Sequence, residues 1–334
     1  RPAYQHALAT ADTEFLRLTM RTTLELGVAP ASLVHALQNH DELTYELVHW
    51  STGHRDDIYT YKGEELTGEA LGDTIRGELT ERLTGENAPY NLVFTTNGIA
   101  CTTATVIAAT LGVTDLDLID DRDDVDRFRR AHLLLAMFNA LQPGVFALSG
   151  WDLCGMLPLP PTNVAGLLRG GDTRWIHRAA HDLMGHNPTA TKSIAGMPRG
   201  RSLYGSIPEQ LADETSFVRQ LRAILRVRSH YDIATSRQVD IPEVSHRAML
   251  VMVHKLASGQ HQLTVLNFAN EEIAGSVRSK HLPPGAEVSD MFTGKPLATV
   301  DDLHSFAIEM PAHHGMSLLV GEAGEASSAG GGHH

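Results

Sequence analysis

The chain has 334 residues, 42% of them apolar and 20% charged, which is enough to bury a sizeable core in one large domain or two. Its formal net charge of −13 argues against a nucleic-acid partner, because binding a phosphate backbone requires basic surface. No run of residues is long and apolar enough to span a bilayer, so no membrane partner is expected. Two cysteines, Cys101 and Cys154, are too few for a disulfide framework and favour a cytoplasmic, reducing location.

The first elements predict an α/β protein. Residues 13–26 carry apolar and threonine side chains at three- and four-residue spacing, which predicts a helix with Asp12 as its N-cap and Gly27 after its end. Residues 33–38 then form a short apolar run of strand length. The same order returns in a helix over 127–142 and a second strand over 145–148. Helices alternating with short buried strands are typical of a parallel sheet.

Two segments interrupt this order. Residues 42–125 contain a helical stretch (73–83), a threonine-rich apolar run (89–112) that fits either strand or buried helix, and an aspartate-rich run (115–126). The aspartate-rich run lacks the glycine and final glutamate of a calcium-binding EF-hand loop, so we expect a solvent-exposed face. Residues 151–208, rich in glycine, proline, arginine and histidine, predict a long loop of the kind that surrounds active sites.

The last third changes its period. Residues 214–231 predict an amphipathic helix, and after Ile233 short strands alternate apolar and polar side chains between turn residues. We therefore predict three parts: an α/β part over 1–232 with a long insertion at about 42–125, an all-β domain over 233–321, and a disordered tail over 322–334.

Polar side chains follow both predicted strands of the α/β part. Asn39, His40, Asp41 and Glu42 come after the first strand, and Trp151 with Asp152 comes after the second. The carboxyl ends of parallel barrel strands are where (β/α)₈ enzymes hold their active sites. A carboxylate beside an imidazole suits hydrogen bonding to vicinal sugar hydroxyls, and its charge favours an oxocarbenium-like transition state. A polar loop or helix cap remains the alternative.

Longer motifs resemble the α-amylase superfamily of glycoside hydrolases. "QNHDELTYELVH" matches that family's Asn-His-Asp motif after the penultimate barrel strand, and "QPGVFALSGWDLCG" matches its last strand, with Gly150, Asp152 and Gly155 in a Gly-x-Asp-x-x-Gly pattern. With "APYNLVFTTNGIACTTA", "DTRWI" and "ATSRQVDIPEVSH", the chain is most similar to bacterial trehalose synthases (maltose α-D-glucosyltransferases) that carry a long insertion. The resemblance implies the C-terminal part of a (β/α)₈ TIM barrel followed by an antiparallel β-sandwich domain.

The resemblance also implies roles for single residues. Asp41 would be the carboxylate that stabilises the transition state, and His40 would bind the same glucose. Asn39, Glu42 and Trp151 are further candidates for substrate contacts, although Trp151 also fits packing beneath the loops. For Asp152 we expect a structural role at the end of the strand, for His132 a packed histidine, and for Arg174 a surface or structural role.

The family's nucleophile and acid/base lie on earlier barrel strands, so we expect this sequence to be a fragment that is inactive alone. The implied parent is an enzyme that interconverts maltose and trehalose by a retaining mechanism, and its small-molecule partner is a disaccharide. No cofactor and no bound metal are expected for these residues, while a structural calcium ion in the parent and an oligomer stay open. Two alternatives also stay open, namely another α-glucosidase or transglycosylase of the superfamily and a non-catalytic sugar-binding homologue.

Overall fold

The computed structural model of the chain describes residues 1–321. The predicted disordered tail, 322–334, lies outside the described residues. Two compact units are present: one comprises 1–16, 36–136 and 147–221, and the other comprises 17–35, 137–146 and the chain from 222 onward. The predicted boundary at 232/233 and the predicted insertion at about 42–125 stay predictions.

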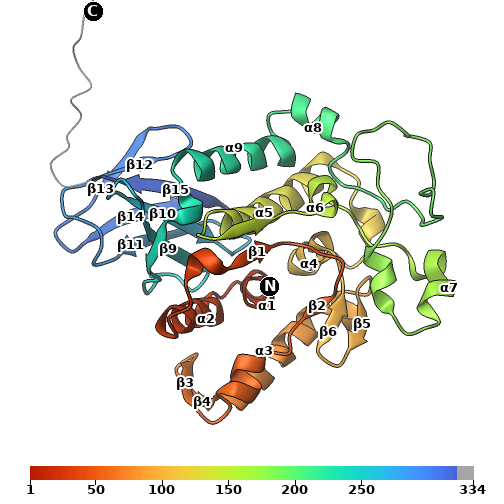
Figure 1. The fold of residues 1–334 in the computed structure, drawn as a ribbon, viewed down its shortest axis with the longest axis horizontal. Coiled ribbons are helices and arrows are strands. Elements are labelled where there is room, and N and C mark those ends of the chain that lie inside the picture. The colour runs from red at the N-terminus through yellow and green to blue at the C-terminus, as the bar shows by residue number, and fades with distance from the viewer. Residues whose placement is uncertain (322–334) are drawn as a thin grey trace, which may run out of the picture. The chain divides into compact units, whose positions relative to one another are not determined.

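The first unit contains helices and small sheets (Figure 1). A three-stranded sheet has the order β2-β6-β5, and β3 pairs with β4 in a hairpin. The helices are α1 (Pro2–Thr10), α3 (Gly68–Leu83), α4 (Thr103–Thr110), α6 (Gly150–Cys154), α7 (Ala165–Leu168) and α8 (Ile207–Ala212), and the strands are β2 (Leu43–Thr44), β3 (Ile58–Tyr61), β4 (Glu64–Thr67), β5 (Leu92–Thr95) and β6 (Gly98–Ala100).

The threonine-rich run that fitted either strand or helix forms both. Its first half makes the hairpin of β5 and β6, and its second half makes α4. Thr102 and Thr105 separate the two, because each side chain hydrogen-bonds the backbone N–H of the other in a capping box. The element therefore changes at the threonine pair and not at a glycine or proline.

Five elements have residues in both units: α2 (Glu14–Glu25), β1 (Val34–Ala36), α5 (Arg122–Ala140), β7 (Val145–Ala147) and α9 (Phe217–His230). The predicted helix over 127–142 and the amphipathic helix over 214–231 are confirmed as α5 and α9. The predicted strands are confirmed as β1 and β7, which pair with each other in a two-stranded sheet. Val145 donates its backbone N–H to the carbonyl of Leu33 at 2.9 Å.

The expectation that both strands are buried is wrong, since the first residue of each strand is exposed and the other two are only half-buried. Val34 is 66% exposed and Val145 is 56% exposed. Within residues 1–321, neither β1 nor β7 has another strand as a partner. An apolar run is buried only when neighbouring elements cover both of its faces, and two paired strands do not cover each other's faces.

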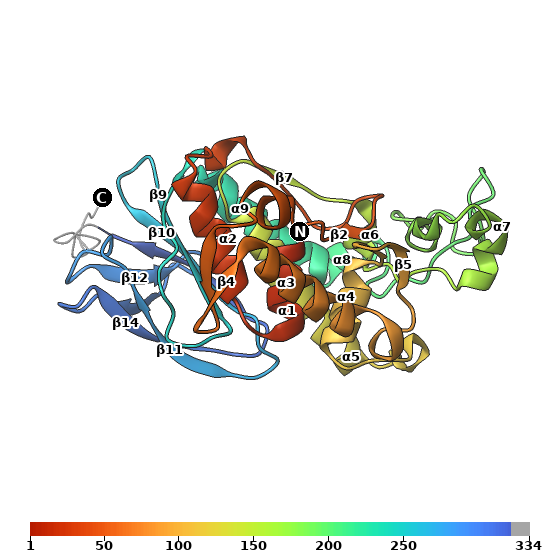
Figure 2. The same ribbon diagram turned by 90° about the horizontal axis from the view of Figure 1, so that it is seen from below.

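The second unit contains most of α2 and an antiparallel β domain, whose strands lie together in the blue part of Figures 1 and 2. One sheet has the order β13-β12-β15-β10-β9-β8, and β11 pairs with β14 in a second sheet. Its strands are β8 (Arg237–Asp240), β9 (Met249–Lys255), β10 (His261–Asn267), β11 (Ile273–Arg278), β12 (Glu287–Asp290), β13 (Pro296–Thr299), β14 (Ser305–Met310) and β15 (Gly315–Val320).

The expected ends of α2 are confirmed, and short strands follow residue 233 as predicted. Asp12 accepts the backbone N–H of Glu14 at the start of α2, and Gly27 follows the helix with a φ of +72°. The described chain is a mixed α/β structure with a multi-stranded antiparallel domain at its C-terminal end. This architecture is the one expected of part of a (β/α)₈ barrel followed by a β domain. In the described part of the chain, no helix has the length and apolar character needed to cross a bilayer.

A buried polar cluster lies inside the large sheet. Nδ1 of His254 on β9 donates to Oε1 of Gln262 on β10 at 2.7 Å, and Nε2 of Gln262 donates to the hydroxyls of Thr264 (2.8 Å) and Ser317 (3.0 Å). Burial lowers the pKa of His254 to about 4, against an ordinary value of 6.5. His254 is therefore neutral at pH 7, with its proton on Nδ1.

We predict that the unfolding free energy falls as the pH drops from about 6.5 to about 4. In this window the unfolded chain binds a proton at residue 254 and the folded chain does not, so acid favours unfolding. His254→Gln should remove this part of the pH dependence. Denaturant unfolding at pH 4.5 and 7.5 measures it.

The control is His230→Gln, which changes an exposed histidine at the end of α9 and should keep the wild-type pH dependence. If His254→Gln and the wild type lose the same free energy between the two pH values, His254 is not the group responsible.

Candidate functional site

Residues 39–42 form a polar loop between β1 and β2, at the surface of the first unit. The loop leaves the interior abruptly, because Leu37 and Gln38 are buried whereas the side chain of His40 is 72% exposed. The side chains of Asp41 and Glu42 are 46% and 17% exposed. The structure therefore brings four of the predicted site residues together in one loop.

The loop's own side chains hold its turn. Oδ1 of Asn39 accepts the backbone N–H of Asp41 at 3.0 Å, which closes an Asx turn, and it also accepts from the guanidinium of Arg1 at 2.8 Å. Nε2 of His40 lies 3.5 Å from Oδ2 of Asp41. Asn39 is therefore occupied by the backbone, whereas His40 and one oxygen of Asp41 face solvent.

Arg174 holds the two carboxylates of the loop. Its Nη1 donates to Oδ1 of Asp41 (3.0 Å) and lies 3.4 Å from Oε2 of Glu42. Asp172 orients the guanidinium from behind, since Nε and Nη2 of Arg174 donate to its two oxygens at 2.8 and 3.0 Å. These bonds from Arg174 lower the pKa of Asp172, although partial burial opposes them. The guanidinium carbon lies 4.2 Å from the ring centroid of Phe94.

The same segment also binds the backbone of the loop. Arg174 and His177 belong to the 3₁₀ helix Thr173–His177, which Asp172 caps. The carbonyl of His40 accepts from Nε2 of His177 (3.1 Å) and from Nε of Arg178 (2.9 Å). Burial lowers the pKa of His177 to about 4, so the ring is neutral at pH 7 and carries its proton on Nε2.

A buried carboxylate lies directly behind the loop. Asp152, the first acidic residue of α6, accepts four hydrogen bonds: from the backbone N–H of Gln38 (3.0 Å), from the hydroxyls of Thr103 (2.8 Å) and Ser149 (2.9 Å), and from Nε2 of His132 (3.0 Å). Burial alone would raise the pKa of Asp152, but the bonds from His132, Thr103 and Gln38 outweigh it and lower the pKa below its usual value. Asp152 therefore makes hydrogen bonds at the end of the strand, as expected, and His132 is packed in the interior, as expected.

Trp151 makes its contacts elsewhere. Its indole N–H donates to the carbonyl of Ala179 at 3.2 Å, and its ring packs against a buried cluster that includes Cys154 and Met156. The substrate-binding role of Trp151 stays a prediction. Cys101 and Cys154 are buried as expected, and burial raises the pKa of Cys101 to about 11, so its thiol stays protonated.

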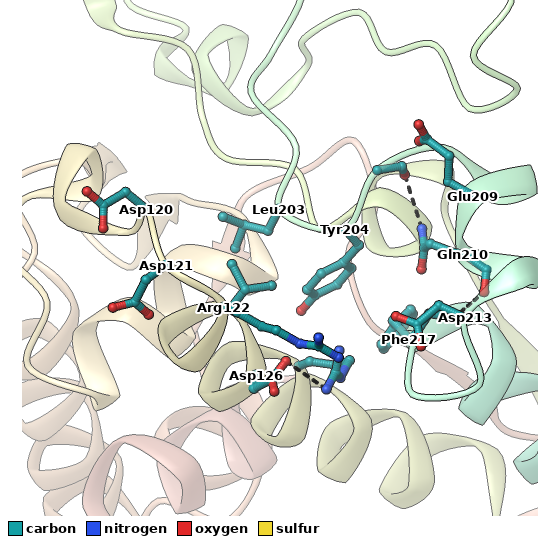
Figure 3. A pocket seen from close by; sticks show the side chains of 14 residues that line it. Asp120, Asp121, Arg122, Asp126, Leu203, Tyr204, Glu209, Gln210, Asp213 and Phe217 are labelled. Carbon is teal, nitrogen blue, oxygen red and sulfur yellow. Dashed lines mark hydrogen bonds and ion pairs between the residues drawn. The ribbon is translucent and has the colours of Figure 1, made fainter.

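A separate pocket of about 540 Å³ opens between the start of α5, the loop at 203–205 and α8 (Figure 3). Its lining includes Asp126, Arg129, Tyr204 and Asp213, and none of residues 39–42. Close to this pocket, carboxylate oxygens of Asp120, Asp121 and Asp124 lie within 4.8 Å of one another. The aspartate-rich run is mostly solvent-exposed, as expected.

Arg174 and Gln38 are the residues whose importance the sequence did not indicate. Arg174 lies more than a hundred residues from Asp41 along the chain, and its motif "DTRWI" was visible only as part of a resemblance. Gln38 reads as the last residue of an apolar run. Its backbone N–H binds the carboxylate of Asp152 on α6, and no pattern in the sequence around Gln38 predicts this contact.

No family model matches the chain, and no curated protein matches it. Among solved structures, the trehalose-6-phosphate hydrolase of Bacillus licheniformis is 13% identical with a TM-score of 0.44, and the match covers 61% of this chain and 41% of that one. The trehalulose synthase of Pseudomonas mesoacidophila MX-45 is 17% identical (TM-score 0.42; 57% and 38% covered). The α-amylase of Geobacillus thermoleovorans, complexed with acarbose, is 12% identical (TM-score 0.41; 83% and 46% covered). The chain therefore spans less than half the length of each of these three structures.

We predict that Arg174→Gln loosens the loop. Without the guanidinium, Asp41 and Glu42 lose their shared cation and repel each other. The backbone amides of residues 41 and 42 should then exchange with solvent faster, which NMR hydrogen exchange measures.

Arg55→Gln is the control, because Arg55 also pairs with a carboxylate, that of Glu69 at 2.7 Å, and both residues lie outside the loop. Unchanged exchange at residues 41 and 42 in Arg174→Gln would show that the turn holds without the arginine.

Proposed function

We propose that this chain contributes one wall of the active site of an α-amylase-type enzyme that transfers glucosyl groups between maltose and trehalose with retention. The observation that carries the proposal is the loop of residues 39–42, in which a half-exposed carboxylate is held in a fixed position behind an exposed histidine. The Asn-His-Asp motif supplies the chemistry, and the bonds from Arg174 and Gln38 supply the rigidity.

Asp41 has the features that a transition-state-stabilising carboxylate needs. Arg174 binds Oδ1 and orients the carboxylate, while Oδ2 lies 3.5 Å from Nε2 of His40. A sugar hydroxyl can donate to Oδ2, and the negative charge favours the positive charge that develops at the anomeric carbon. His40, the most exposed residue of the loop, is placed to hydrogen-bond a neighbouring hydroxyl.

The retaining reaction needs two further carboxyl groups, about 5–5.5 Å apart, on either side of the glycosidic bond. Among the described residues, the carboxylates of Glu42 and Asp172 also contact Arg174. Their oxygens therefore bind the guanidinium and are not placed as nucleophile or acid. We therefore assign the nucleophile and the acid/base to a part of the full-length protein outside this sequence. The half-exposed strands β1 and β7 would pair or pack with that part.

We predict that Asp41→Asn in the full-length protein lowers turnover of maltose by about 10²–10³-fold, because the amide keeps the size of the side chain but not its charge. Thermal unfolding should change little, since the side chain is half exposed. Chromatography of trehalose and glucose formed from maltose measures the effect.

Asp57→Asn is the control, because Asp57 is also an exposed aspartate paired with a histidine, His54, at 2.7 Å. Turnover near that of the wild type in Asp41→Asn would remove Asp41 from the site. A folded, full-length wild type that makes no trehalose but releases glucose would favour an α-glucosidase instead.

We also predict that residues 1–334 alone do not convert maltose, because one stabilising carboxylate cannot also serve as nucleophile and acid. Incubating the purified chain with maltose and analysing the products tests this. Parent-like rates from the chain alone would mean that residues 1–334 contain a complete set of catalytic groups.

A further inference from the structure

The carboxylate of Asp152 has no free hydrogen-bonding capacity and is shielded from water. An ionised carboxylate accepts about four hydrogen bonds, and Asp152 receives four, three of them from residues at least 20 positions away in the sequence. The donors come from the end of β1 (Gln38), from α4 (Thr103), from α5 (His132) and from the residue before α6 (Ser149). A single side chain therefore fixes these segments relative to one another.

Gln38 is the donor that leads to the candidate site. Besides its backbone bond to Asp152, its Oε1 accepts the backbone N–H of Thr103 at 3.2 Å. Gln38 directly precedes Asn39, whose side chain binds the backbone N–H of Asp41. A displacement of Gln38 is therefore passed to Asp41 through the peptide bond to Asn39 and the Asx turn that Asn39 closes.

His132 holds the carboxylate from the opposite side. Its Nε2 faces an oxygen of Asp152, and its Nδ1 lies 2.9 Å from the hydroxyl of Tyr204. The ring of Tyr204 stacks on Phe217 with a centroid distance of 5.3 Å and an interplanar angle of 20°. Both ring nitrogens of His132 are thus occupied, so the imidazole cannot rotate without breaking two bonds in the interior.

We infer that Asp152 and His132 are positioning residues for glucosyl transfer: through Gln38 they set the place of Asp41 relative to the sugar. This inference rests on the proposed function. A purely structural role would also explain a buried, hydrogen-bonded histidine–carboxylate pair, and the two roles differ in what they predict. A structural pair changes only stability, whereas a positioning pair changes turnover in protein that remains folded.

The chain offers a matched control in a second histidine–carboxylate pair. His6 on α1 is fully buried and binds Glu78 on α3 at 2.6 Å. The pair resembles His132–Asp152 in chemistry and in the burial of its histidine, whereas the side chain of Glu78 is 25% exposed. No hydrogen bond connects it directly to Gln38 or to residues 39–42 within the described chain.

The experiment measures kcat, KM and the thermal midpoint for maltose conversion by the full-length protein carrying Asp152→Asn, His132→Gln or His6→Gln. Asp152→Asn should lower kcat by about 10²-fold, since misplacing a catalytic group by about 1 Å costs that much, while KM changes less than about threefold. His132→Gln should lower kcat less, because the amide can still donate to Asp152. His6→Gln should lower the midpoint and leave kcat within about twofold.

A milder variant covers the case in which Asp152→Asn does not fold. Thr103→Val removes one of the four donors and keeps the shape of the side chain, and it should lower kcat several-fold in folded protein. If the folded variants at 103, 132 and 152 all retain the wild-type kcat, the inference is wrong and the pair is structural.

Amide hydrogen exchange separates this inference from the proposed function. If the wild type does not act on maltose, the proposed function fails, and exchange at residues 38 and 41 still tests positioning. Faster exchange at both residues in Thr103→Val, with no change in His6→Gln, supports it. Faster exchange at residue 38 alone overturns it.

Discussion

The arrangement of the first unit depends on one buried anion, the carboxylate of Asp152. Burying a charge costs several kcal/mol unless polar partners replace the lost water. Asp152 has four such partners, from Gln38, Thr103, His132 and Ser149, and each must be in place for the charge to be tolerated. The need for all four donors makes the interaction specific, because an alternative packing of α4, α5 or the segment after β1 would remove one of them.

The polar loop is held by two different kinds of interaction. On its inner side, the hydrogen bond from the backbone N–H of Gln38 to Asp152 is buried and shielded from water. On its outer side, Arg174 binds carboxylates that are partly exposed, so salt and competing ligands weaken that contact. The backbone of residues 38–41 is therefore more rigid than the side chains of Asp41 and Glu42. The proposed sugar-binding role requires this combination, because the backbone places the carboxylate in advance and Oδ2 of Asp41 is left for a hydroxyl.

Much of the fold followed from local pattern, and the site only in part. The helix at Glu14–Glu25, the long helix α5 and the strands after 233 were predictable because each repeats its period over enough residues. The loop at 39–42 was predictable from a short motif. Its supports were not, because the contacts of Asp41 with Arg174 and of Gln38 with Asp152 join residues more than a hundred positions apart. The burial of β1 was overestimated for the same reason, because the burial of a strand depends on which elements pack on it in the tertiary structure, and the local sequence does not show these.

The buried histidines show why the charge near the loop comes from arginine. His177 lies against the carbonyl of His40, but burial lowers its pKa to about 4, so at pH 7 it supplies one directed hydrogen bond and no charge. His254 in the β domain is neutral for the same reason. A guanidinium keeps its proton under all these conditions and can bind two carboxylates at once. With His177 neutral at pH 7, Arg174 and not His177 supplies the positive charge bonded to Asp41, and Asp172 orients that guanidinium.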